Sequence, residues 1–228
     1  MDKDDNVYLI GEDIVDPYGG AFKITRGLST KFPERVISSP ISEGGIIGLG
    51  TGMSIEGFYP IVEIMFGDFM TLGFDQIINS AAKFRQMYNN KVEVPLAIRT
   101  PMGGGRGYGP THSQSLESFF LGIPGFKVFN LNVFQDIEKT VEEIIINTKD
   151  PKLIVEHKLD YPEKMLSSTD LDQSGFIVDK TFVKNLECIS ISMIELEYCD
   201  CTMLAYGHTA LLAKSINDTK GLATCCPI

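Results

Sequence analysis

The sequence predicts an α/β protein with a doubly wound, mainly parallel sheet, followed by the incomplete start of a second α/β domain. Two observations support this fold class. Strand-like and helix-like segments alternate from residue 6 to residue 158. The strand-like segments are short, rich in β-branched residues and mostly apolar on both faces, which is typical of parallel strands covered by helices. Alternation of this kind indicates helices on both faces and right-handed crossovers.

The expected elements follow each other in order. The predicted strands are residues 6–13, 35–39, 59–66, 94–100, 126–131 and 152–158. The predicted helices are residues 19–32, 43–57, 68–88, 113–123 and 133–149. In such sheets, ligands bind beyond the carboxyl ends of the strands. The segments that follow residues 39, 66 and 100 are therefore expected to share one rim.

The regular alternation ends after Lys158, where the chain becomes polar and rich in turn-forming residues. We expect one domain over residues 1–162, a linker over 163–184 and a second domain that begins over 185–228. In that last stretch, residues 201–216 are typical of a strand, a tight turn and a helix. One strand and one helix bury too little apolar surface to be stable alone, so this second domain is expected to be truncated or to dock elsewhere.

Composition excludes several classes of protein. The 228 residues carry a formal net charge of −10, and without a basic run the chain is not expected to bind nucleic acid. We predict no membrane span, because no apolar segment is long enough. The acidic start has no signal-peptide pattern, which favours the cytoplasm, with an organellar matrix left open. The five cysteines, all within the last 41 residues, fit no trusted zinc spacing and are expected to be reduced thiols.

Glu43 is an isolated acid at the end of a predicted strand, in the stretch SSPISEGGIIGLGTG. One interpretation is structural, because a carboxylate in the first turn of a helix is stabilised by the helix dipole by about 0.3–1 kcal/mol. The other is functional. The helix that follows contains five glycines, each of which costs about 1 kcal/mol relative to alanine, so it needs a packing reason such as a close backbone approach. The five are Gly44, Gly45, Gly48, Gly50 and Gly52.

The loop RTPMGGGRGYGPTHSQS contains five glycines and a histidine, His112, just before the next predicted helix. Loops at strand ends often carry function, and His112 is the histidine best placed for proton transfer. The structural alternative is a surface histidine that caps the following helix. His157, in a predicted strand, and His208, in the incomplete second unit, are interpreted as structural.

Three phenylalanines, Phe66, Phe69 and Phe74, lie near the start of the long predicted helix. They are expected in the core, although one could face the rim and stack on a planar ring. Two motif matches fail. The glycines at 48, 50 and 52 lie inside a helix rather than in a dinucleotide-binding turn. Gly67-Asp68 lacks the second glycine of a Gly-Asp-Gly diphosphate–metal motif, so no metal site is predicted in this chain.

Several motifs in fixed order carry a resemblance to a known family. The segments VYLIGED, PISEGGIIGLGTGMSIEGFYPIVEIMF, DQIINSAAKFRQM, RTPMGG, THSQS and PGFKV resemble the β subunit of the thiamine-diphosphate-dependent E1 component of 2-oxoacid dehydrogenase complexes. The resemblance extends from Asn6 to Tyr161. It implies a transketolase-like pyrimidine-binding domain over 1–162, and the start of a transketolase C-terminal-like domain over 185–228.

The resemblance also implies roles for individual residues. Glu43 matches the glutamate that hydrogen-bonds N1′ of the cofactor's aminopyrimidine and favours its imino tautomer, which activates the thiazolium ring. Phe69 matches the aromatic residue against that ring, while Met65 and Ile41 match residues that line the pocket. His112 matches an active-site histidine that handles the substrate or the transfer of the acyl group to a lipoyl group.

In this family the diphosphate and Mg²⁺ are held by a partner α subunit, in an α₂β₂ assembly with active sites at α/β interfaces. The resemblance therefore implies an E1 α partner and a lipoyl-bearing E2 component. Family members also have a full C-terminal domain of roughly 130 residues, whereas this sequence resembles only its opening. The glycine-rich loop also differs from that of ordinary pyruvate enzymes.

Three hypotheses follow. The leading one is a β-type subunit that decarboxylates a 2-oxo acid and transfers the acyl group. The second is a truncated, catalytically silent interaction chain. The third is another split thiamine enzyme, either transketolase-like or acetoin-cleaving.

Overall fold

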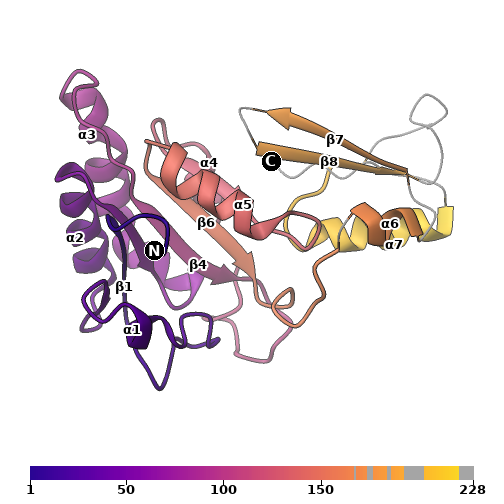
Figure 1. Ribbon diagram of the computed structural model, residues 1–228, viewed down its shortest axis with the longest axis horizontal. Coiled ribbons are helices and arrows are strands. Elements are labelled where there is room, and N and C mark those ends of the chain that lie inside the picture. Colours follow the sequence, from indigo (N-terminus) through magenta and orange to yellow (C-terminus); the bar gives the residue numbers. More distant parts are fainter. Residues whose placement is uncertain (167, 174–176, 184–185, 193–202, 221–228) are drawn as a thin grey trace. The chain divides into compact units, whose positions relative to one another are not determined.

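A computed structural model describes residues 1–166, 168–173, 177–183, 186–192 and 203–220 (Figure 1). The chain forms two compact units. The first contains Met1–Val128 and Ile145–Val155, and the second contains Phe129–Ile144 and Glu156–Ile228. The domain boundaries expected at 162/163 and 184/185 remain a prediction. In the part of the chain described, no helix is long and apolar enough to cross a membrane.

The predicted parallel sheet is confirmed. Its strands are β1 (Val7–Gly11), β2 (Val36–Ser38), β3 (Tyr59–Glu63), β4 (Ala97–Met102), β5 (Lys127–Asn130) and β6 (Lys152–His157). They are arranged in the order β2-β1-β3-β4-β6-β5. β1 pairs in parallel with β2 and β3, and β3 pairs in parallel with β4. All four of these strands therefore end at the same edge of the sheet.

The helices are shorter and less regular than the sequence predicts. In the first unit they are α1 (Leu28–Lys31), α2 (Glu43–Ile55), the 3₁₀ helix η1 (Gly67–Gly73), the π-helix η2 (Gln76–Ala81), α3 (Ala82–Met87) and α4 (Ser118–Leu121). The long helix expected over 68–88 is thus three different helical segments. The helix expected over 19–32 is wrong except for its last turn, because Gly19, Gly20 and Lys23 have positive φ angles that interrupt it.

The core of the first unit lies between α2 and the sheet. Ile46 and Ile47 of α2 pack with Val62 of β3 and with Leu96 just before β4, all fully or almost fully buried. Gly50 makes this approach possible. A Cβ atom at that position would lie 2.7 Å from Val62 Cγ2 and 2.8 Å from Leu96 Cδ1. Gly50 therefore has a packing reason within this chain, whereas a Cβ on Gly52 would meet nothing within 4 Å.

The second unit contains a second small core. Its described elements are α5 (Ile137–Glu142), which lies within the helix predicted over 133–149, α6 (Ser168–Gln173), the antiparallel strands β7 (Ile177–Val183) and β8 (Leu186–Ser192), and α7 (Thr209–Lys220). The π-helix η3 (Glu143–Asn147) follows α5. Buried side chains from four segments form this core: Val133, Phe134, Leu171, Ala205, Ala210 and Ala213.

One expectation about the second unit needs correction, and some elements were not predicted. The linker over 163–184 stays a prediction, although α6 and β7 lie within it, and neither α6 nor the antiparallel β7–β8 pair was predicted. Residues 203–206, expected to be part of a strand, are not in one. The helix after them is confirmed as α7. Cys199, Cys201, Cys225 and Cys226 lie outside the described residues.

Lys152 is a buried cation at the start of β6. Its side chain is fully buried, and its Nζ donates a hydrogen bond of 2.5 Å to the carbonyl oxygen of Thr148. Burial, with a smaller contribution from the nearby Lys127, lowers the pKa of Lys152 from 10.5 to about 7. The charged form is therefore destabilising in the folded protein.

Gly50→Ala should destabilise the protein by about 1–2 kcal/mol, because the destabilisation from overpacking exceeds the stabilisation from the higher helix propensity of alanine. Gly52→Ala is the matched control in the same helix, since nothing lies within 4 Å of a Cβ at that position. It should stabilise the protein by about 0.5–1 kcal/mol. Urea unfolding of both variants measures the difference. Equal effects would contradict the proposed close approach.

Lys152→Met should raise the free energy of unfolding at pH 7 and below by on the order of 1–3 kcal/mol. Between pH 7 and 10.5 the unfolded lysine binds more protons than the folded one, so the wild type gains stability with rising pH. The advantage of the variant should therefore shrink over that window. Unfolding curves at pH 6.5 and pH 10 test this, with the exposed Lys91→Met as a control that should show no such trend.

Candidate active site

The candidate site lies at the carboxyl edge of the sheet in the first unit, as the sequence predicts for this fold. Glu12 follows β1, and Glu43 begins α2 after β2. Phe66 and Phe69 follow β3, and the glycine-rich loop of residues 103–115 follows β4. Because these strands are parallel neighbours, segments far apart in the sequence meet along one rim.

Glu43 is a buried carboxylate at the first position of α2. Only 7% of the residue is exposed, and the preceding Ser42 does not cap the helix with its side chain. Among the described residues, none donates a hydrogen bond or forms an ion pair with the Glu43 carboxylate. Buried carboxylates normally have such partners. The Glu43 carboxylate is therefore suited to accept a hydrogen bond from a bound molecule.

A second carboxylate, Glu12, supports the position of Glu43. It is 7% exposed, and its Oε1 accepts a hydrogen bond of 3.1 Å from the backbone N–H of Ser42. Burial raises the pKa of Glu12, the Ser42 hydrogen bond partly opposes this, and the nearby charge of Glu43 raises it further. The two acids are thus close enough to interact electrostatically.

Phe69 and His112 meet in an aromatic cluster, which we define as Phe22, Phe66, Phe69, Tyr108 and His112. The His112 ring lies edge-to-face on Phe66 at 4.8 Å and on Phe69 at 5.2 Å between centroids. Phe66 also contacts Phe22 at 5.6 Å and Tyr108 at 5.7 Å. The predicted proximity of His112 and Phe69 is therefore present in the structure.

The glycine-rich loop is fastened to the segment after β3 by Asp68, which is buried. Asp68 Oδ1 accepts hydrogen bonds from Gln114 Nε2 at 2.7 Å and from its backbone N–H at 3.3 Å. The Gly103 N–H donates to the Gln114 carbonyl oxygen at 3.1 Å and closes the base of the loop. These contacts hold the segment that carries His112 over Phe66 and Phe69.

Met65 and Ile41, the two residues predicted to line the cofactor pocket, differ in exposure. Met65 is half-buried after β3, whereas Ile41 is 83% exposed just before Glu43. η1, which carries Phe69, packs against the first turn of α2, since a Cβ on Gly44 would lie 3.4 Å from the Leu72 carbonyl oxygen. The elements that carry Glu43 and Phe69 are therefore adjacent. No hydrogen bond joins Glu43 to the aromatic cluster within the described residues.

Sequence reasoning missed several parts of this site. Phe22 lies in a segment expected to be helical, and Tyr108 lies among glycines, so neither pattern signalled an aromatic contact. Glu12 could have been suspected as an acid at the end of an apolar strand. The buried ion pair between Glu63 Oε2 and Arg99 Nη1, at 2.7 Å, joins neighbours in the β3–β4 register. The sequence pattern that could have predicted this ion pair is one acid and one base, each within an otherwise apolar strand.

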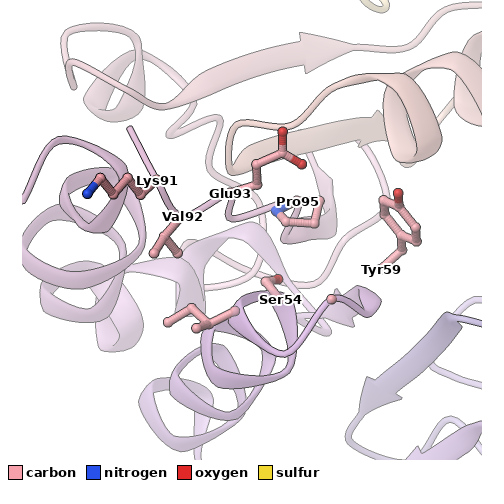
Figure 2. A pocket seen from close by; sticks show the side chains of 8 residues that line it. Ser54, Tyr59, Lys91, Val92, Glu93 and Pro95 are labelled. Carbon is pink, nitrogen blue, oxygen red and sulfur yellow. The ribbon is translucent and has the colours of Figure 1, made fainter. Parts of the chain in front are cut away.

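The pocket in Figure 2 is a different feature, a cavity of about 180 Å³ in the first unit. It is lined by the end of α2, the start of β3 and the segment before β4, including Ser54, Tyr59, Lys91, Glu93 and Pro95. These positions belong to the amino ends of the strands. The pocket therefore does not include any of the predicted site residues.

Comparison with known proteins places the chain in a family. Residues 1–164 match the family described as transketolase, pyrimidine binding domain. Because this match covers most of the chain, the protein belongs to that family.

Three relatives narrow the comparison. The chain is 34% identical over 227 residues to the rice (Oryza sativa subsp. japonica) pyruvate dehydrogenase E1 component subunit beta-1, mitochondrial, covering 98% of this chain and 58% of the relative. It is 34% identical to the Bacillus subtilis 2-oxoisovalerate dehydrogenase subunit beta, covering 98% and 65%. It is 39% identical over 167 residues to an acetoin:2,6-dichlorophenolindophenol oxidoreductase subunit beta of Cupriavidus necator, covering 69% and 49%. The chain thus spans between about half and two thirds of these relatives.

Solved structures support the fold. A split-gene transketolase, described as an inactive beta4 tetramer, superposes with a TM-score of 0.61 at 18% identity, covering 99% of this chain and 65% of that one. A Pichia stipitis transketolase gives a TM-score of 0.64 at 16% identity, covering 97% of this chain and 31% of that one. Identities this low bear on the fold alone.

Gln114→Ala should loosen the loop, because it removes a hydrogen bond to a buried carboxylate. We expect trypsin to cleave after Arg106 about 3–10-fold faster under native conditions. Timed digestion with mass spectrometry measures this rate. Ser115→Ala, at the exposed neighbouring position, is the control and should cleave like the wild type. An unchanged rate for Gln114→Ala would show that Asp68 does not hold the loop.

Proposed function

We propose that this chain is the pyrimidine-binding, β-type part of a thiamine-diphosphate-dependent 2-oxoacid dehydrogenase E1 component. The observation that carries the proposal is Glu43, a buried carboxylate without a hydrogen-bond or ion-pair partner among the described residues, at the rim of a transketolase-type pyrimidine-binding domain. The identities of 34–39% to E1 and acetoin oxidoreductase β subunits support it.

The residues at the rim fit the aminopyrimidine half of the cofactor. Glu43 would exchange a proton with a ring nitrogen through its buried carboxyl group, where exclusion of water strengthens the interaction. Phe69 would lie against the flat ring, and Met65 and Ile41 would line its pocket. When bound, thiamine diphosphate supplies a nucleophilic carbon and an electron sink for decarboxylation.

His112 would act on the substrate side of the same rim. Its imidazole is held between Phe66 and Phe69 by edge-to-face contacts, which limits its rotation. A histidine is able to give and take a proton near neutral pH. We assign it to handling the 2-oxo acid, or to the transfer of the acyl group to a lipoyl group.

The site as proposed needs a second chain. Large apolar residues on and next to α2 and η1 are exposed, with Ile41 at 83%, Leu72 at 64% and Leu49 at 50%. Such a group is suited to a protein interface. We propose that an E1 α subunit covers it and supplies the site for diphosphate and Mg²⁺, in an α₂β₂ assembly that serves a lipoyl-bearing E2 component. A cytoplasmic location stays a prediction.

The substrate class is the open part of the proposal. The relatives are named for pyruvate, 2-oxoisovalerate and acetoin. Exposed, glycine-rich sequence around Arg106 and Tyr108 forms the loop beside His112, and substrate choice would depend on it. A panel of 2-oxo acids and acetoin with a dye as electron acceptor would separate a dehydrogenase from an acetoin-cleaving enzyme.

Glu43→Gln should reduce turnover at least about 10²-fold when the chain is co-expressed with an α-type partner, because the amide is unable to exchange the proton. The exposed Glu56→Gln, at the other end of α2, is the matched control and should keep full activity. Circular dichroism and thermal unfolding should show that both variants remain folded. Activity retained in Glu43→Gln would remove this residue from the mechanism.

Thiamine diphosphate binding provides a readout that is independent of turnover. Calorimetry on the co-expressed complex with Mg²⁺ should show saturable binding that weakens in Glu43→Gln. Binding without turnover of any substrate would favour the silent interaction chain. Absence of both binding and assembly with the partner would overturn the proposed function.

A further inference from the structure

Three side chains outside the candidate active site form a compact group in the second unit. Ligand atoms of His157, Asp160 and His208 all lie within 4.8 Å of one another, and all three residues are half-buried. Among the described residues of the chain, this is the one group of three or more potential metal ligands at such distances. Because the two outer members are 51 positions apart in the sequence, folding brings them together.

The backbone around the group fixes where each ligand lies. His157 is the last residue of β6, and a turn follows in which the Asp160 N–H donates to the His157 carbonyl oxygen at 2.9 Å. His208 directly precedes α7, after Gly207. Gly207 has a φ of 54°, and a Cβ there would lie 2.3 Å from Asn130 Oδ1. This left-handed conformation and the close contact with Asn130 favour glycine here, and the glycine sets the path of the chain into His208.

The contacts within the group are close. His208 Nδ1 lies 2.5 Å from Asp160 Oδ1. At this distance the two atoms share a proton in a short hydrogen bond. The imidazole rings of His157 and His208 stack at 4.3 Å with an angle of 9° between their planes. The second carboxylate oxygen, Asp160 Oδ2, is buried and has no hydrogen-bond partner among the described residues.

We propose that His157, Asp160 and His208 bind a divalent first-row transition metal ion such as Zn²⁺. Two imidazole nitrogens and one carboxylate oxygen are a ligand set that such ions prefer. Ligand atoms on tetrahedral zinc are about 3.3 Å apart for bonds of about 2.0–2.1 Å. The farthest pair of ligand atoms therefore has to approach by about 1.5 Å. His208 Nδ1 and Asp160 Oδ1, which are 2.5 Å apart, have to separate slightly. One of the two stacked imidazoles also has to turn, so that a nitrogen of each ring points at the ion. The ion replaces the proton between Asp160 and His208, and water completes its coordination.

The role of this ion is structural. It links the end of β6 to the start of α7. The chain between these two points, which includes α6, β7 and β8, is thereby cross-linked at its ends. A bound ion of this kind stabilises the folded unit by an amount that grows with the logarithm of the free ion concentration above its Kd. The site shares no residue with the candidate active site, so the proposal can be tested independently of the proposed function.

Zn²⁺ and Co²⁺ binding to the full 228-residue chain tests the proposal, in a background where the five cysteines are replaced by serine. This background prevents thiolates from binding the metal. We expect one equivalent of Co²⁺ with visible d–d absorption, and a rise of a few degrees in the midpoint of thermal unfolding with Zn²⁺ that EDTA reverses. His208→Gln and His157→Gln should each weaken binding at least about tenfold.

His112→Gln is the matched control, because it removes the remaining histidine and leaves the proposed ligands intact. It should bind the metal like the parent chain. Unfolding in EDTA should show whether the ligand variants are folded, and Asp160→Asn gives a milder, nearly isosteric change. Equal metal content in the parent and in the His157→Gln/His208→Gln double variant would overturn the proposal, as would the absence of a visible Co²⁺ spectrum in the parent.

Discussion

The close approach of α2 to the sheet at Gly50 is the constraint on which the candidate active site depends. Without a side chain at this position, α2 lies directly on Val62 and Leu96. A helix held at this distance carries its first residue, Glu43, to the end of β2 and beside η1. The same contact excludes water from behind the helix. A carboxylate placed there is buried because of the packing below it, and not because another side chain neutralises it.

The rim therefore contains acids of two kinds. Glu63 is compensated by Arg99 in the neighbouring strand, and a buried pair with good geometry is tolerated. Glu12 and Glu43 have no such cation among the described residues, although the Ser42 N–H partly compensates Glu12. A buried, uncompensated carboxylate lowers stability. Its presence at the edge where parallel sheets bind ligands is what distinguishes a binding function from the helix-dipole interpretation of Glu43.

The sequence was most informative where local pattern and packing agree. The strands, α2 and the rim could be predicted because short runs that are apolar on both faces have to be buried between layers of helices. The pattern failed at residues 19–32, where positive φ angles interrupt a helix-like composition, and at 68–88, where close packing imposes 3₁₀ and π turns. The β7–β8 pair was missed because the apolar and polar residues of β7, IVDKTFV, do not alternate. The contacts of Phe22 and Tyr108 depend on loop geometry, which no periodicity encodes.

The two candidate sites differ in what completes them. The group of His157, Asp160 and His208 supplies three ligands from one unit of this chain, so an ion and water are enough to satisfy it. In the proposed function, the Glu43 rim would supply a proton-exchanging acid, an aromatic wall and a histidine, whereas Ile41 beside it is 83% exposed. A pocket that must exclude water to make Glu43 effective needs a cover over Ile41. The exposure of Ile41 is therefore an argument for a second chain, made from the site itself and independent of the names of the relatives.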